Sequence, residues 1–467
     1  MRAKPPALLI KTMNPLFEIS NPYFSIGISF HLINLLLLLK KCDKIILQLG
    51  NVPANSEKDG NIMDKIFIGL LIFMLIIGGM CGIFYLLNER NYNDMIEYID
   101  TFKVEPTNQL EPQRDEHGNW YFETDEDLTV LHLTDIHITG GFANKKQDKM
   151  AINAVAAMVR EEEPDLVIIT GDISFAIPNT GTINNRYAHQ MFIRLMENLG
   201  VYWTVTFGNH DDESFNYHRR QAVADMYADE KLERCLFMQS PNGVSGMGNH
   251  VINIKNSNGE VTKSLIMIDS RSYIHTGLIG GTIDALLWNY DCVNQDQTDW
   301  YESVINLYNP QSSLMFFHIP LIEVKNAYYE YIANGRQNTE NVKWHGGVDG
   351  EDHTDEVVFS SQLENQPLFD KVLELGNTKA MFFGHDHLNN FVMDYKGVIF
   401  SYGYSIDYSA YNGDLENLGL QRGCTVLTLS PDGEFNASDI VHENYYQDKY
   451  QPLYEKESIE MKGLYDN

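Results

Sequence analysis

Residues 201–211 read VYWTVTFGNHD, an apolar run that ends in glycine and then in three polar side chains. The aromatic and β-branched residues of this run are typical of a buried strand. Such a strand would bring Asn209, His210 and Asp211 to one edge of a sheet. An amide oxygen can ligate a metal ion, an imidazole can move a proton, and a carboxylate can orient that imidazole. Because Asn and Asp also form ordinary turns after strands, the interpretation depends on the rest of the chain.

The same pattern recurs after four other apolar runs, at 128–133, 166–170, 313–317 and 379–383. The polar residues that follow these runs are Asp135 and His137, Asp172, His318, and His385 and His387. In open α/β sheets, side chains at the carboxyl ends of strands converge on one crevice. These residues are therefore predicted to share one site, although they lie far apart in the chain.

Each piece alone has an ordinary explanation. A single His after an apolar run, such as His318, is often only a hydrogen-bonded polar residue, and Gly-Asp after a strand is usually a turn. The pair His385 and His387 is harder to explain, because two imidazoles on alternate residues of a turn serve no packing purpose. Their joint occurrence at successive strand ends favours a functional site over coincidence.

The residue types indicate which metals such a site would hold. Carboxylate, imidazole and amide ligands without thiolate suit Fe, Mn, Zn or Mg, and the five cysteines are scattered without a CxxC pair. The candidates are too many for one ion but enough for two, with one carboxylate bridging. We therefore expect two divalent or mixed-valence metal ions as cofactors. Two ions ~3.5–4 Å apart can activate a bridging water and clamp both oxygens of an in-line displacement.

In this order, the motifs resemble those of the calcineurin-like metallophosphoesterase superfamily over about residues 128–440. The segments FGNHDDES (207–214), FHIPL (317–321) and GHDHLNNF (384–391) resemble the small purple-acid-phosphatase-like branch. The resemblance implies a four-layer α/β/β/α sandwich and a metallophosphoesterase that uses a metal-bridging hydroxide. It would hydrolyse phosphate esters, with monoesters as the first expectation.

The resemblance also implies metal ligands in two sets that share one carboxylate. One set is Asp135, His137, Asp172 and His387; the other is Asp172, Asn209, His318 and His385. His210 would face the substrate phosphoryl group and protonate the leaving oxygen, with Asp211 orienting its ring.

One position departs from the family pattern. The motif that begins Gly171-Asp172 often continues to an Asp, or to a Tyr in purple enzymes, but here that position is Phe175. Phenylalanine cannot ligate, so no iron–tyrosinate colour is expected and the metal identity stays open. The stretches 271–300 and 345–356 lie outside the motifs, and loops beside a scaffold often set specificity. Arg271, Tyr273 and His345 are therefore candidates for substrate contact, although structural roles are the commoner explanation.

Short apolar runs alternate with amphipathic stretches from residue 128 onward, which predicts the α/β fold class. The predicted helices are 149–162, 186–199, 216–228, 297–307 and 368–375. Further strands are predicted at 250–254 and 264–268, and β-hairpins around 391–393, 398–402, 425–429 and 435–440.

Residues 66–87 carry no charged side chain and are long enough to span a bilayer as a helix, whereas the run 24–39 is marginal. A signal peptide starting at Met63 is the alternative, and then 1–62 would be absent from the mature protein. The run lacks a small-x-small cleavage site, which favours an uncleaved anchor. Residues 40–65 carry five lysines, so the positive-inside bias predicts an extracytoplasmic catalytic domain, secreted if the segment is cleaved.

The predicted order is thus an N-terminal segment (1–65), a transmembrane helix (66–87), a linker (88–127), a catalytic domain (128–445) and an acidic tail (446–467). Lys and Arg total 34 against 64 Asp and Glu, and no basic run with aromatics occurs. Nucleic-acid binding is therefore not expected. A phosphate-ester substrate and, through the helix, a membrane are the expected partners, while the oligomeric state stays open.

Two other functions fit parts of the pattern. A phosphodiesterase or nucleotide pyrophosphatase could use the same core, because two metal ions can serve either bond. A catalytically silent, membrane-tethered binding module would be signalled by degraded ligands, and none of the expected ligand positions is degraded.

Overall fold

A computed structural model describes residues 57–104, 110–350, 357–363, 366–410, 422–444, 446–448 and 451–452. The chain divides into two units, Met1–Met80 and Cys81–Asn467. Helix α2 (Glu57–Ile99) begins in the first unit and ends in the second. By length and composition, the helical stretch Ile66–Phe102 could cross a membrane. The weaker apolar run 24–39 lies outside the described residues.

The first sheet of the second unit has five strands in the order β14-β13-β3-β4-β5. Its parallel strands are β3 (Leu128–Leu133), β4 (Leu166–Thr170) and β5 (Tyr202–Thr206). Strand β13 (Gly423–Leu429) pairs antiparallel with β3, and β14 (Ile440–Asn444) pairs antiparallel with β13 at the edge of the sheet. The helices that connect or follow the parallel strands are α3 (Lys145–Glu162), α4 (Arg186–Leu199) and α5 (Arg220–Tyr227).

The second sheet has nine strands in the order β1-β2-β6-β7-β8-β10-β12-β11-β9. In chain order they are β1 (Gln113–Arg114), β2 (Trp120–Glu123), β6 (His250–Lys255), β7 (Val261–Met267), β8 (Ser312–Phe316), β9 (Val342–Gly346), β10 (Thr378–Phe383), β11 (Val392–Tyr395) and β12 (Val398–Tyr402). The intervening helices are α6 (Leu278–Leu286), α7 (Gln295–Tyr308), α8 (Ile322–Ala333) and α9 (Leu368–Leu375). Strands β7, β8, β10 and β12 run parallel, so their carboxyl ends share one edge.

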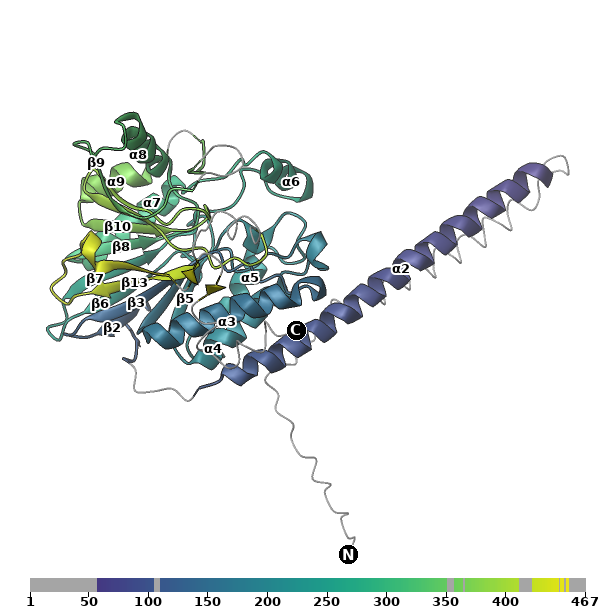
Figure 1. The fold of residues 1–467 in the computed structure, drawn as a ribbon, viewed down its shortest axis with the longest axis horizontal. Helices are drawn as coiled ribbons and strands as arrows, with labels where there is room; N and C mark the ends of the chain where they lie inside the picture. The colour runs from purple at the N-terminus through teal and green to yellow at the C-terminus, as the bar shows by residue number, and fades with distance from the viewer. Residues whose placement is uncertain are drawn as a thin grey trace, which may run out of the picture. The chain divides into compact units, whose positions relative to one another are not determined.

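Alternate residues of the central strands enter different apolar cores, as the two-residue period of a strand requires. In β4, Val167 and Ile169 pack with α3 and α4, whereas Leu166 and Ile168 pack against residues of the nine-stranded sheet. Met381 of β10 belongs to a third core, which it shares with α7 and α9. Figure 1 shows α3 and α4 on one side of the strands and α7 and α9 on the other. The chain is therefore a mixed α/β structure whose strands are covered on both faces, which explains their uninterrupted apolar sequences.

Most predicted elements are confirmed, and helix 186–199 and strands 128–133, 166–170 and 398–402 have the predicted bounds. The strand prediction at 435–440 is wrong, because Ala437–Asp439 forms a 3₁₀ turn (η5) and β14 starts only at Ile440. Asn436 and Asp439 form a capping box that stabilises this turn. Helices α6 and α8 and strand β9 were not predicted.

The segment 88–127, expected to be a linker, is part of the folded unit. Met95, Ile99 and Phe102 are buried in the core that contains α3 and α4. Asp100 accepts two hydrogen bonds from Arg194 of α4, at 2.6 and 3.0 Å. These apolar residues recur every three or four positions, as in a helix that packs on one side. The polar residues between them made this pattern hard to recognise in the sequence.

The second half of the same segment extends the nine-stranded sheet. Strand β2 pairs in parallel with β6, and β1 pairs with β2. Phe122 is fully buried in the core between the two sheets. Of the predicted acidic tail, the structure describes only β15 (Tyr446–Asp448) and β16 (Gln451–Pro452), which pair with each other.

Candidate metal centre

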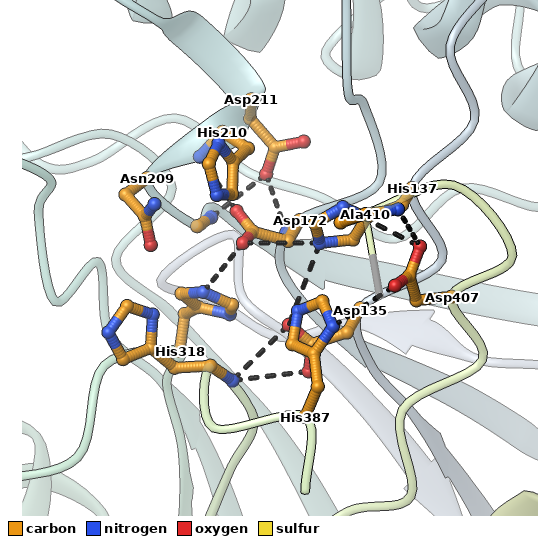
Figure 2. A network of polar contacts seen from close by, with 12 residues as sticks. Asp135, His137, Asp172, Asn209, His210, Asp211, His318, His387, Asp407 and Ala410 are labelled. Atoms are coloured by element: carbon orange, nitrogen blue, oxygen red, sulfur yellow. Dashed lines mark hydrogen bonds and ion pairs between the residues drawn. The ribbon is translucent and has the colours of Figure 1, made fainter. Parts of the chain in front are cut away.

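The predicted ligands lie together at the carboxyl ends of the central strands. Asp135 and His137 follow β3, Asp172 follows β4, and Asn209 follows β5. His318 follows β8, and His385 and His387 follow β10. Figure 2 shows these loops from both sheets pointing their polar side chains toward one another. The predicted convergence of residues far apart in sequence is therefore confirmed.

Four of these residues have left-handed backbone conformations that are uncommon outside glycine. The φ angles are 52° at Asp135, 55° at His137, 51° at Asp172 and 76° at His385. Each such conformation costs roughly 1–3 kcal/mol and persists only where surrounding contacts impose it. Here the neighbouring loops impose it, because the amides of Asp135 and His137 donate to the carbonyls of Gly171 and Asp172 at 3.2 and 3.0 Å. Such strain concentrates at functional sites.

Two glycines are required by the close approach of these loops. A Cβ at Gly208 would collide with the carboxylate of Asp172, and a Cβ at Gly384 would collide with Thr134 and Asp135. The glycines that precede the polar residues therefore allow the loops to meet, a role that the sequence alone did not reveal.

The donor atoms form two sets that share Asp172. Atoms of Asp135, His137, Asp172 and His387 all lie within 4.8 Å of one another, and so do atoms of Asp172, His318 and His385. In the first set, His387 Nε2 lies 3.2 Å from Asp135 Oδ1. In the second set, His318 Nε2 lies 3.1 Å from Asp172 Oδ2. These two sets contain the ligands that the family resemblance implied, except for Asn209, which was expected in the second set.

The residues fit metal ions by a test that is independent of the family. Asn209 Oδ1 is buried without a hydrogen-bond partner among the described residues. A buried polar atom left in this state costs about 1–3 kcal/mol. Asn209 uses its other atom, since Nδ2 donates to the Tyr273 hydroxyl at 3.3 Å and leaves Oδ1 as the available acceptor. A cation at the second donor set would satisfy this oxygen.

Charge compensation dominates the electrostatics of the cluster. Burial opposes ionisation of Asp135, but the nearby His387 and His318 outweigh it and lower the pKa of Asp135 to about 2. Burial likewise opposes protonation of His318, yet Asp172 raises the pKa of His318 to about 9. For Asp172, the positive charges of His318 and His210 outweigh burial and hold the pKa well below its usual range. Without a metal ion, His318 thus holds a proton that metal binding would release.

His210 lies at the edge of the cluster, with 28% of its side chain exposed. Its Nδ1 lies 2.7 Å from Glu213 Oε1. Burial of the ring lowers its pKa, but Asp172 and Glu213 outweigh that effect and raise the pKa of His210 above its ordinary value. The imidazole therefore favours its protonated form.

The predicted role of Asp211 is corrected by its contacts. Its carboxylate accepts backbone N–H groups from the β4 loop and from Gly208, at 2.8–3.0 Å. The donors in the β4 loop are Asp172, Ile173 and Ser174. Asp211 thus joins two motif loops, while Glu213 is the carboxylate on the His210 ring. The spacing could have revealed this, because the 3₁₀ turn η4 (His210–Asp212) brings positions three apart onto one face.

The position of Phe175 is explained by packing. Its ring centroid lies 4.9 Å from that of His137 and 5.1 Å from that of His210. The aromatic ring thus restricts the orientation of one expected ligand and of the expected proton donor, and it contributes no charge.

The three candidates for substrate contact have different locations. The Tyr273 hydroxyl lies 3.3 Å from both Asn209 Nδ2 and Glu213 Oε1, so Tyr273 belongs to the site. Arg271 is held by Asp291 through an ion pair of 2.5 Å. His345 lies on the edge strand β9, and no described contact joins it to the metal ligands.

Asp407 is a neighbour of the cluster that the sequence analysis missed. It is fully buried in the loop after β12, and its carboxylate lies 3.3 Å from His387 Nδ1 and 4.0 Å from His137 Nδ1. Strand β12 is a sixth apolar run that ends at this edge, so the same rule of polar residues after strands could have found Asp407.

Comparison with known proteins agrees with this arrangement. Residues 128–389, more than half of the chain, match the family model of the calcineurin-like phosphoesterases. The chain belongs to this family. Within it, the chain is 24% identical over 343 residues to "Probable inactive purple acid phosphatase 29" of Arabidopsis thaliana, a match that covers 66% of this chain and 78% of that protein. It is 25% identical over 325 residues to "Probable inactive purple acid phosphatase 14" of the same plant, covering 62% and 73%.

The similarity to these relatives places the chain in the purple-acid-phosphatase-like branch of the family. A crystal structure of a dimetal phosphatase from Danio rerio has a TM-score of 0.38 and 12% identity, and the match covers 65% of this chain and 93% of that one. The word "inactive" in the plant names refers to those proteins.

Proposed function

We propose that the chain hydrolyses phosphate esters at a dinuclear metal centre, with monoesters as the preferred substrates. The main support is the pair of donor sets, each with its atoms within 4.8 Å, that share the carboxylate of Asp172. Membership of the calcineurin-like phosphoesterase family supports the same reaction class.

In this proposal, the carboxylate of Asp172 would serve two ions. The first ion would be held by Asp135, His137, Asp172 and His387, and the second by Asp172, Asn209, His318 and His385. When bound, the ions (Fe, Mn, Zn or Mg) activate a water for in-line attack and neutralise phosphoryl charge. The buried oxygen of Asn209, which has no hydrogen-bond partner among the described residues, supports its assignment as a ligand.

His210 is proposed as the general acid. Glu213 engages its Nδ1 at 2.7 Å, so Nε2 is the nitrogen that would face a bound phosphoryl group. The pKa of His210 is raised above its ordinary value, which favours the protonated form that an acid needs in order to give a proton to the leaving alcohol. Phe175 and Glu213 would hold the ring in the orientation needed for that transfer.

We also propose that the catalytic unit is a four-layer α/β/β/α sandwich that extends the predicted range 128–445 to include 88–127. The support is the set of three apolar cores, one for each pair of adjacent layers. The apolar residues 66–87 are proposed to anchor the protein in a membrane, with the catalytic unit on the extracytoplasmic side. The lysines in 40–65 support this orientation.

The proposal is tested on the full-length protein purified in detergent. Elemental analysis should find two metal ions per chain. Hydrolysis of p-nitrophenyl phosphate should exceed that of bis(p-nitrophenyl) phosphate. A preference for the diester would replace the proposal with the phosphodiesterase alternative. Two bound ions without hydrolysis of either ester would favour a silent binding module, and absence of any bound metal would contradict the site itself.

A further inference from the structure

The loop after β12 is attached to the first donor set along its backbone. Because β12 pairs in parallel with β10, residues 403–410 leave the sheet beside the loop that carries His387. The amides of Ile406 and Asp407 donate to the carbonyl of Asp135, at 3.2 and 2.9 Å. Thr134 and Ser405 form a further parallel bridge. The position of Asp407 is thus determined relative to the ligand Asp135.

The carboxylate of Asp407 lies between two imidazoles of the same donor set. Oδ2 lies 3.3 Å from His387 Nδ1, and Oδ1 lies 4.0 Å from His137 Nδ1. Figure 2 shows Asp407 on the side of both rings away from Asp172. The opposite nitrogens face the donor set, since Nε2 of His387 lies 3.2 Å from Asp135 and Nε2 of His137 lies 3.5 Å from Asp172. An imidazole that ligates through one nitrogen is oriented by the partner of the other.

Asp407 is itself held in place by backbone groups. Its Oδ1 accepts the amides of Ser409 and Ala410 at 2.7 and 2.8 Å. Its carbonyl oxygen accepts Arg422 Nε at 2.7 Å. A buried carboxylate with this many fixed partners is preorganised, so little conformational entropy is lost when it orients the His387 ring.

The second donor set has no equivalent carboxylate among the described contacts of its histidines. His318 Nδ1 lies 2.7 Å from the backbone carbonyl oxygen of Thr170, a neutral acceptor. The His385 ring lies edge-on to Tyr290, with centroids 4.4 Å apart. The two sets therefore differ by one negative charge behind their imidazoles.

We propose that Asp407 is a positioning residue for the first metal ion only. It directs Nε2 of His387 toward that ion, and its charge increases the basicity of both His387 and His137, so the first position retains its ion more tightly than the second. This inference rests on the proposed two-metal function but assigns a role to a residue outside the ligand sets. An outer carboxylate of this kind typically changes metal affinity by about 10- to 100-fold.

The test measures each position separately in the full-length protein. His318→Ala disables the second position, so Zn²⁺ titration with chelator competition then reports on the first. His387→Ala disables the first position and leaves the second to be measured. Asp407→Asn, which keeps the shape and removes the charge, is added to each background. We expect it to weaken Zn²⁺ binding about 10- to 100-fold in the His318→Ala background and to leave it unchanged in the His387→Ala background.

Asp394→Asn is the matched control, because among the described residues the Asp394 carboxylate accepts a single hydrogen bond, from the turn amide of Gly397 at 3.0 Å. Equal losses in both backgrounds, or no loss in either, would overturn the proposal. If the Asn variant fails to fold without metal, Asp407→Glu takes its place; the retained but displaced charge should weaken only the first position. A wild-type protein that binds no Zn²⁺ would instead contradict the two-metal function.

Discussion

The two halves of the candidate centre differ in the groups behind their metal-facing atoms. His137 and His387 of the first half have the Asp407 carboxylate behind them, at 4.0 and 3.3 Å. In the second half, His318 has the carbonyl of Thr170, and Asn209 has the phenol of Tyr273. One half is thus supported by a buried charge and the other by neutral dipoles. Two metal positions that share one carboxylate therefore need not have equal affinity.

The largest effect is expected from Asp172→Ala, because Asp172 is the carboxylate that both halves share. We expect both ions to be lost and turnover to fall by more than the ~10²–10⁴-fold that a general acid contributes. Elemental analysis and p-nitrophenyl phosphate hydrolysis measure the two effects. Asp394→Asn is the control, and an unchanged metal count in Asp172→Ala would refute the bridging assignment.

His210→Ala should separate chemistry from metal binding in both halves. We expect two ions to remain and kcat to fall ~10²–10⁴-fold, because a general acid is lost while every proposed ligand stays. The loss should be larger for an alkyl phosphate than for p-nitrophenyl phosphate, since a poor leaving group needs the proton more. Equal losses for the two esters would argue that His210 stabilises the phosphoryl group without donating the proton.

Asp211→Asn should act on stability. The buried carboxylate accepts backbone amides from two loops, and an amide in its place would direct N–H groups at some of those donors. Since charged hydrogen bonds contribute about 1.5–3 kcal/mol each and are not additive, we expect a loss of about 3 kcal/mol in the free energy of unfolding. Thermal or urea unfolding of the metal-free protein measures it. A variant with normal stability and a displaced pH–rate profile would restore the original assignment of Asp211 to His210.

Glu213→Gln should have the smallest effect, of about 10-fold in kcat. Glu213 is one of the groups that raise the pKa of His210, so its neutralisation lowers that pKa. Activity that needs protonated His210 is lost as pH rises through this pKa. The alkaline limb of the pH–rate profile should therefore move to lower pH in the variant. A limb that stays in place would show that Glu213 does not control the proton on His210.

The sequence predicted which polar residues would lie together because the rule behind that prediction is topological. Parallel strands that lie side by side end at one edge, so Asp135 and Asp172 meet at the edge of one sheet, and His318 and His387 meet at the edge of the other. The packing of the two sheets then brings both groups together. The same alternation of apolar runs predicted the α/β class and most strand positions.

The missed elements lack a local pattern. In α6, the exposed positions are occupied by apolar residues, namely Leu278, Ile279, Ile283 and Leu286. The helix therefore lacks the contrast between a polar and an apolar face by which a periodic pattern predicts a helix. The segment 88–127 looked like a linker because its buried residues are few among polar ones. Their burial depends on α4 and β6, which lie far away in the sequence.

The amino-acid sequence by itself determined the family, the α/β class and the residues able to bind metal, because each follows from a local motif or from strand order. The sequence allowed more than one carboxylate to serve a histidine, and only the folded structure decided between them. Asp211 is adjacent to His210 in sequence yet binds backbone amides, whereas Glu213 meets the ring through one 3₁₀ turn. Asp407 reaches His387 only because β12 pairs with β10. Hydrogen bonds act over about 3 Å, and such distances between side chains are set by packing rather than by sequence spacing.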